Sequence, residues 1–217
     1  MSESDHWYKK MTLRRELLPF ALAMAAVVTA SNILVQYPFR HFGLGDILTW
    51  GAFSYPIAFL VNDLTNRRYG KPAARRVVFA GFVVGVLLSV FLATPRIAIA
   101  SGTAFLTGQL LDITVFGRLR RQAWWRAPLA ATMCGSLLDT AIFFSLAFSA
   151  SFVFLDTAFG MPDGSLAFPS ALFGGQAPLW VTLALGDLSV KVVMGLLMLV
   201  PYGALLNVLK PVPALAQ

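Results

Sequence analysis

The chain alternates between long apolar runs and short polar stretches. A helix needs about 20 mainly apolar residues to cross the hydrocarbon core of a bilayer. Six runs approach or exceed that length, and they cover residues 17–37, 47–64, 77–93, 97–116, 128–154 and 178–206. The pattern therefore predicts an all-α polytopic membrane protein, in which residues 1–217 form one domain of six transmembrane helices.

The composition supports this class. Hydrophobic residues make up 58% of the 217 residues and charged residues only 12%, whereas a soluble domain has about 25% charged residues. The first run has the basic start of a signal peptide. It is longer than the apolar core of such peptides, about 7–15 residues, and further apolar runs follow it. We therefore expect it to be retained as the first helix.

The basic residues are distributed unevenly between the connecting segments. Fourteen of the 17 Lys and Arg residues lie before the first run, in the segments 65–76 and 117–127, or at Lys210. The opposite segments hold only Arg40 and Arg96. Since Lys and Arg accumulate in cytoplasmic loops, the pattern places both termini in the cytoplasm.

The last apolar run carries two charges, Asp187 and Lys191. Each charge costs about 2.5–3.5 kcal/mol at the centre of a transmembrane helix on insertion scales. Residues four apart share one helix face, so the two charges are placed to pair. The pair either neutralises itself or forms a polar centre that faces a cavity between helices.

Besides Asp187, three carboxylates lie within or near the runs: Asp139, Asp63 and Asp112. Asp139 and Asp187 each lie about 14–17 Å deep at the helical rise of about 1.5 Å per residue, so we expect them to meet near the midplane. Asp63 and Asp112 lie closer to the cytoplasmic helix ends, where capping or pairing with adjacent arginines is expected. Residues 108–112 and 135–139 share the pattern Gly-x-Leu-Leu-Asp, through either an internal repeat or chance.

Amides, a proline and two glycines complete the candidate features. Asn32 and Gln36 share a helix face, which suits either interhelical hydrogen bonding or substrate contact. Gln109 lies within the fourth run.

Pro56 is expected to kink the second helix, and Pro201-Tyr202-Gly203 to interrupt the last one. The small-xxx-small spacing of Gly81 and Gly85 permits close helix packing, and it offers a face for a homodimer.

Several chemistries have no motif in this chain. Cys134 is the single cysteine, and the two histidines, His6 and His41, lie outside the predicted spans. The chain has no nucleotide-binding P-loop and no H-E-x-x-H or G-x-S-x-G motif. We therefore expect no cofactor, no metal site and no enzymatic activity. An aspartyl enzyme built from Asp139 and Asp187 is the remaining catalytic alternative, but Lys191 favours ion pairing.

Short segments in a fixed order resemble a known family, the bacterial queuosine precursor transporters (the YhhQ family). The resemblance extends over nearly the whole chain and includes the polar intramembrane positions. The segments are Ser31-Asn32 with Leu34-Val35-Gln36, residues 49–56, Asp63-Leu64-Thr65, Arg96-Ile97-Ala98, Gly108-Gln109 with Leu111-Asp112, Trp124-Trp125, Asp139-Thr140, Asp187 with Lys191, and Tyr202-Gly203.

The resemblance implies a six-span protein of the bacterial inner membrane. Such proteins import 7-cyano-7-deazaguanine and 7-aminomethyl-7-deazaguanine for salvage into the tRNA nucleoside queuosine. The expected mechanism is secondary or facilitated transport through a midplane polar site. The alternative is a substrate-binding membrane subunit of an ATP-driven vitamin-type uptake system. The expected partners are the deazapurine and the lipid bilayer, with a homodimer possible and no nucleic acid.

The chemistry of a deazaguanine suits the polar residues of this chain. Its ring N–H and exocyclic amine together match a carboxylate, and its carbonyl needs a donor. Its flat ring needs an aromatic face. The candidate substrate-binding residues are the carboxylates Asp139 and Asp187, the donors Lys191, Gln109, Asn32 and Gln36, and the aromatic residues Trp50, Phe53 and Tyr55.

Overall fold

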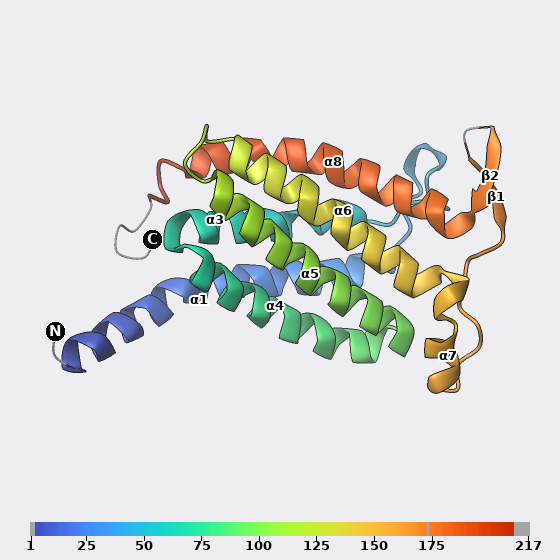
Figure 1. Ribbon diagram of the computed structural model, residues 1–217, viewed down its shortest axis with the longest axis horizontal. Helices are drawn as coiled ribbons and strands as arrows, with labels where there is room; N and C mark the ends of the chain where they lie inside the picture. The colour runs from blue at the N-terminus through green and yellow to red at the C-terminus, as the bar shows by residue number, and fades with distance from the viewer. Residues whose placement is uncertain (1–2, 173, 211–217) are drawn as a thin grey trace.

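The computed structural model describes residues 3–172 and 174–210 and places them in one helical bundle (Figure 1). Side chains are described from Arg15 onward. The helices are α1 (Glu3–Leu34), α2 (Gly51–Ser54), α3 (Pro56–Tyr69), α4 (Lys71–Leu92), α5 (Pro95–Leu119), α6 (Arg126–Phe148), α7 (Phe154–Ala158) and α8 (Leu179–Leu205). A hairpin of β1 (Pro169–Leu172) and β2 (Gly175–Pro178) precedes α8.

Five helical segments in the described part of the chain are long and apolar enough to cross a membrane: Arg15–Leu34, Lys71–Leu92, Pro95–Leu119, Arg126–Phe148 and Leu179–Leu205. This confirms the polytopic helical fold class. The second predicted run differs from a single helix. Residues 47–50 are not helical, with Thr49 in an isolated bridge to Pro38, and α2 and α3 follow with Pro56 as the first residue of α3. Because proline has no N–H, the carbonyl of Ala52 has no helical donor there. The count of six spans stays a prediction.

Two other helix ends differ from the sequence-based expectation. The predicted interruption at Pro201-Tyr202-Gly203 is wrong, since α8 continues through Pro201 to Leu205. Tyr202 is fully buried, and its ring packs edge-on against that of Phe116 with the ring centroids 6.5 Å apart. This contact holds the last turn in place. The fifth run was expected to reach Phe154, but α6 ends at Phe148 and Ser149 adopts an extended conformation.

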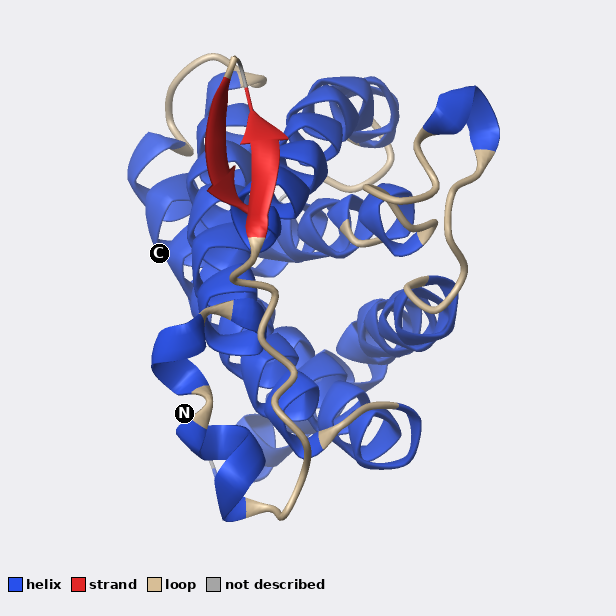
Figure 2. Ribbon diagram, turned by 90° about the vertical axis from the view of Figure 1, so that its right-hand side faces the viewer, coloured by secondary structure: helices blue, strands red, loops and turns tan. Residues whose placement is uncertain are grey.

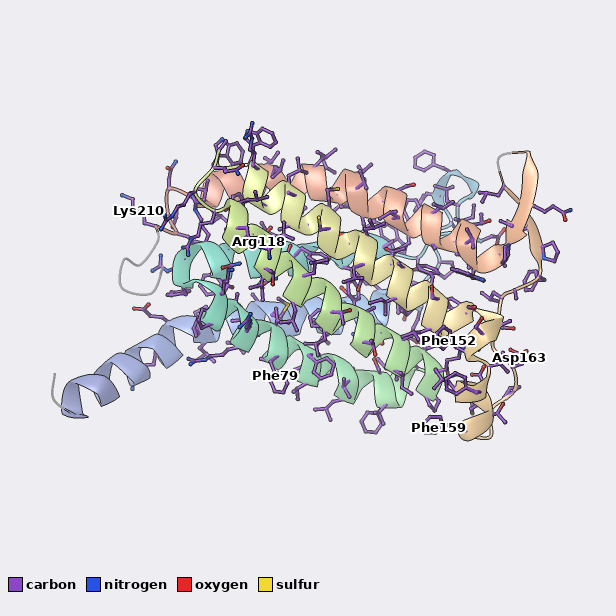
Figure 3. The ribbon with its side chains drawn as sticks, in the orientation of Figure 1. Phe79, Arg118, Phe152, Phe159, Asp163 and Lys210 are labelled. Atoms are coloured by element: carbon purple, nitrogen blue, oxygen red, sulfur yellow. The ribbon has the colours of Figure 1, made fainter. Side chains whose placement is uncertain are left out.

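The two ends of the bundle have different chemical character. Arg118 and Lys210 lie at one end, together with the start of α1 and the end of α8, and we call this the basic end (Figure 3). Phe152 and Asp163 lie at the opposite end, the hairpin end. Figure 2 looks onto the hairpin end with β1 and β2 nearest the viewer. The assignment of the basic end to the cytoplasm stays a prediction from loop charge.

A buried arginine holds the hairpin end together. Arg96, near the start of α5, is only 1% exposed, and its Nη1 lies 2.6 Å from Oδ2 of Asp156 on α7. Its Nε and Nη2 donate to the carbonyls of Leu146 and Ser149 at 2.8 and 2.5 Å. Since the guanidinium presents its donors in a rigid fork, it links α5 with the end of α6 and with α7.

Close helix packing depends on glycines at two places. A Cβ on Gly81 would lie 2.5 Å from Cγ of Met24, and one on Gly85 would lie 3.1 Å from Cγ1 of Val28. The predicted close packing is therefore confirmed, with α1 as the partner of α4. Helix α1 of the same chain covers this face, and a homodimer stays a prediction.

The second close approach is the crossing of α5 and α6. A Cβ on Gly108 would lie 3.0 Å from the carbonyl oxygen of Gly135, and a Cβ on Gly135 would lie 3.0 Å from the carbonyl oxygen of Gly108. The two glycines that begin the similar segments 108–112 and 135–139 therefore face each other. The helix pair meets backbone to backbone at this point.

We expect Gly135→Ala to lower the melting temperature of the purified protein. The new methyl group would meet Cε1 of Phe59 at 2.6 Å and the Gly108 carbonyl, and overpacking costs about 1–3 kcal/mol. Gly102→Ala on α5 is the matched control, since its nearest contact is 3.4 Å, and it should be neutral or slightly stabilising. Equal melting temperatures for the two variants would contradict the tight crossing.

Candidate functional site

A cavity of about 470 Å³ lies in the half of the bundle at the hairpin end. Its walls come from the C-terminal parts of α1, α4 and α6, the N-terminal parts of α5 and α8, and the loop 45–49. Small-molecule sites typically enclose about 300–1,000 Å³. The cavity is therefore of a size that suits a small ligand.

Lys191 of α8 forms the charged centre of this cavity. Its Nζ lies 2.7 Å from Oδ2 of Asp139 on α6 and 2.6 Å from Oδ2 of Asp187 one turn earlier on α8. Lys191 is 4% exposed and Asp139 is 5% exposed. The expected pairing of Asp187 with Lys191 and the expected meeting of Asp139 and Asp187 are both confirmed.

Thr140 and Tyr55 complete the surroundings of the ammonium group. Nζ of Lys191 also donates to Oγ1 of Thr140 at 3.0 Å, and this hydroxyl donates to Oδ2 of Asp187 at 2.9 Å. The three donors of the ammonium are thus all used. The ammonium lies 6.0 Å from the centroid of the Tyr55 ring, within range of a cation–π contact.

The carboxylates of the centre keep acceptor capacity. Within the described part of the chain, the side-chain contacts of Asp139 and Asp187 are made through Oδ2. Both residues also line the cavity. Two carboxylates and one ammonium carry a formal charge of minus one, so the centre is suited to accept hydrogen bonds from a neutral or cationic ligand.

The two amides of α1 lie on the cavity wall, as their shared helix face predicts. Nδ2 of Asn32 donates to the carbonyl of Val28 at 2.9 Å, and its Oδ1 accepts from Oγ of Ser89 on α4 at 3.1 Å. Nε2 of Gln36 donates to the carbonyl of Asn32 at 3.3 Å. The interhelical hydrogen bond to Ser89 is confirmed, and contact with substrate stays a prediction.

Three of the predicted substrate-binding residues lie away from the cavity wall. Trp50 and Phe53 pack against Phe39 with ring centroids 4.8 Å apart in each case. Gln109 is buried beyond the α5–α6 crossing, toward the basic end. Tyr55 does line the cavity.

Other aromatic residues on the wall were missed from the sequence. Phe143, Phe144 and Phe148 of α6 line the cavity together with Tyr55, and their rings pack on one another with centroids 5.1–5.9 Å apart. Phenylalanines within an apolar run do not indicate whether they face lipid or a cavity. Thr140 could have been found, because it follows Asp139 directly.

Asp63 and Asp112 form a second polar region that the sequence misassigned. Neither carboxylate pairs with an arginine within the described residues, so the predicted pairing is wrong. Both side chains point into the bundle, where Asp112 accepts from Nδ2 of Asn62 at 2.8 Å and Asp63 from Oγ1 of Thr132 at 3.4 Å. Within the described part of the chain, no three His, Cys, Asp or Glu residues gather as metal ligands.

We expect Lys191→Met to destabilise the protein strongly, by roughly 3–5 kcal/mol, because it leaves Asp139 and Asp187 buried without their cation. Asp187→Asn should cost less, since the Asp139–Lys191 pair remains. Thermal unfolding of the purified protein in detergent measures both effects. Lys210→Met, at an exposed position, is the matched control. A Lys191→Met protein as stable as this control would show that the ion pairs contribute little.

The fold and the cavity define a helical, multi-pass membrane protein with an internal cavity of a size that suits a small molecule. Residues 49–94 and 86–205 match the family described as a putative vitamin uptake transporter. The queuosine precursor transporter of Escherichia coli (strain K12) is 38% identical over 205 residues, which cover 84% of this chain and 83% of that protein. The probable queuosine precursor transporter of Haemophilus influenzae is 32% identical over 90% of this chain and 88% of that protein.

A probable queuosine precursor transporter of Bacillus subtilis is 30% identical over 54% of this chain. No solved structure matches the chain. The chain belongs to the putative vitamin uptake transporter family, and it is a multi-pass protein of a bacterial membrane. The resemblance seen in the sequence is confirmed.

Proposed function

We propose that this protein imports the queuosine precursors 7-cyano-7-deazaguanine and 7-aminomethyl-7-deazaguanine across the bacterial inner membrane, and that these bases bind in the cavity. The observation that carries the proposal is the Asp139–Lys191–Asp187 centre in a cavity of about 470 Å³. The printed names of the relatives in Escherichia coli and Haemophilus influenzae support the substrate class.

The centre supplies the contacts that a deazaguanine needs. A carboxylate with a free oxygen accepts from the ring N–H and the exocyclic amine. The aromatic side chains on the wall offer faces against which a flat ring packs. Asn32 and Gln36 of α1 supply amide groups on the cavity wall.

The position of the cavity supports import by secondary or facilitated transport. It lies at the hairpin end, opposite the basic loops, and the positive-inside rule places that end outside the cytoplasm. An importer binds its substrate from that side before the opposite end opens. Family relatives named as transporters point to a transport role rather than an enzymatic one. The bridge of Lys191 between Asp139 and Asp187 also differs from an aspartyl pair that shares one proton.

Uptake of both labelled bases into proteoliposomes that contain only this protein tests the proposal. We expect uptake by the wild-type protein and its loss in Asp139→Asn, since a hydrogen bond to a charged group contributes about 1.5–3 kcal/mol. Asp163→Asn, at an exposed position in the outer loop, is the control and should transport normally.

Two other outcomes of this experiment would change the interpretation. Tight binding of the bases without uptake would favour the substrate-binding subunit of an ATP-driven system. Neither binding nor uptake by the folded protein would contradict the proposed substrate.

The charge of the cavity predicts a preference between the two bases. Asp46 lines the cavity in addition to the charged centre, so the wall carries three carboxylates and one ammonium. We expect the cationic aminomethyl base to bind more tightly than the cyano base. Asp187→Asn should then weaken the aminomethyl base about 10-fold or more and the cyano base less. Equal losses for the two bases in a binding titration would contradict an electrostatic preference.

A further inference from the structure

Asp63 of α3 and Asp112 of α5 face each other in the half of the bundle toward the basic end. Asp63 is 2% exposed and Asp112 is fully buried. Asn62, the residue before Asp63 on α3, donates to Oδ1 of Asp112 at 2.8 Å, so both carboxyl groups lie in one buried region between α3 and α5. Two ionised carboxylates in one buried region repel each other, and burial away from water makes the repulsion more costly.

Few hydrogen bonds reach the two carboxylates of the pair. Within the described residues, Thr132 and Asn62 each donate one hydrogen bond to the pair. Oδ1 of Asp63 and Oδ2 of Asp112 have no partner there, and the same is true of Oδ1 of Asn62, both polar atoms of the Gln109 amide and the hydroxyl of Tyr202. Buried polar atoms normally have partners, and each carboxylate of the pair thus keeps one oxygen that can take a proton.

The nearest titratable and charged groups lie toward the basic end. Tyr202 of α8 lies within electrostatic range of Asp63, and also of Arg67 and Arg120. The guanidinium of Arg67 donates to the carbonyl of Arg120 at 2.8 Å, and that of Arg120 donates to the carbonyl of Arg67 at 2.7 Å. These reciprocal bonds tie the ends of α3 and α5 together and close the basic end. The neighbouring helix α6 contributes the uncharged Thr132 and Ser136.

The pair and the cavity lie on opposite sides of the α5–α6 crossing. A Cβ on Gly108 would meet Cβ of Asp139 at 3.0 Å, and a Cβ on Gly135 would meet Cβ of Asp112 at 3.3 Å. Asp139 and Asp112 therefore both lie next to the crossing, Asp139 on the side of the cavity and Asp112 on the side of the basic end. One carboxylate site contains the lysine and borders the cavity, while the other has no lysine and is closed.

We propose that the Asp63–Asp112 pair binds the proton that is coupled to transport, at a site separate from the substrate cavity. One proton is held as a carboxyl O–H between the two side chains while the basic end is closed. Opening of the Arg67–Arg120 contact admits water, the O–H bond breaks, and the proton passes to water on the cytoplasmic side. This inference rests on the proposed import function.

The test uses a neutral base, because any protons that accompany its uptake are then carried by the protein and not by the ligand. The wild-type protein in proteoliposomes should acidify a pH dye inside the vesicles when 7-cyano-7-deazaguanine is added outside. An outside-acid pH gradient should also drive accumulation of this base above its external concentration. Wild-type uptake that neither moves protons nor responds to the gradient would overturn the inference while leaving the import function intact.

The variants Asp63→Asn and Asp112→Asn test the site itself. An amide resembles the protonated carboxyl group, so we expect both proteins to fold with a melting temperature equal to or above that of the wild type. Exchange of labelled for unlabelled base without a pH gradient should stay within about twofold of wild type, while accumulation driven by the gradient is lost. Asp139→Asn should lose both activities because it alters the substrate cavity.

The remaining outcomes distinguish the proposed coupling role of the Asp63–Asp112 pair from the proposed import function. Gradient-driven accumulation at the wild-type level in both amide variants would overturn the coupling role of the pair. Loss of exchange as well as accumulation in well-folded variants would also overturn it. If the variants do not fold, the dye measurement on the wild-type protein still decides whether uptake is coupled to proton movement. A wild-type protein that does not bind the base at all would instead contradict the proposed function.

Discussion

The ammonium of Lys191, held between the carboxylates of Asp139 and Asp187, is the interaction on which the rest of the site depends. Three charges inside a membrane domain are tolerated only when they neutralise and hydrogen-bond one another. Their pairing therefore determines how α6 and α8 face each other. It also leaves acceptor oxygens beside a cavity lined by Tyr55 and the phenylalanines of α6. The same residues thus join the helices and form the chemistry available to a ligand.

The crossing of α5 and α6 divides the interior into two polar regions. Gly108 and Gly135 bring the two backbones together, with Asp139 on the cavity side and Asp112 on the closed side. At the basic end, Phe116 and Tyr202 pack against each other, and Arg67 and Arg120 hold the ends of α3 and α5. A transporter needs such a division, because its two ends must open in turn around a central barrier.

The charged centre could be predicted from the sequence, whereas the rest of the site could be predicted only in part. Asp187 and Lys191 are four residues apart on one helix, so their pairing follows from helical geometry alone. Trp50 and Gln109 were assigned to the substrate site because of their side-chain chemistry, yet they lie away from the cavity wall. Phe143 and Phe144 lie on that wall, but nothing in an apolar run distinguishes a phenylalanine facing a cavity from one facing lipid.

The amino-acid sequence by itself determined the helical membrane class, most of the long helices and the concentration of basic residues at one end. These properties depend on local hydropathy and on charge next to the bilayer, which any single segment expresses alone. Only the tertiary structure decided that Asp63 and Asp112 point into one buried region, and that α1 covers Gly81 and Gly85. Such contacts depend on which helices are neighbours and on how each is rotated about its axis. Both follow from packing among all helices at once, and no single segment encodes them.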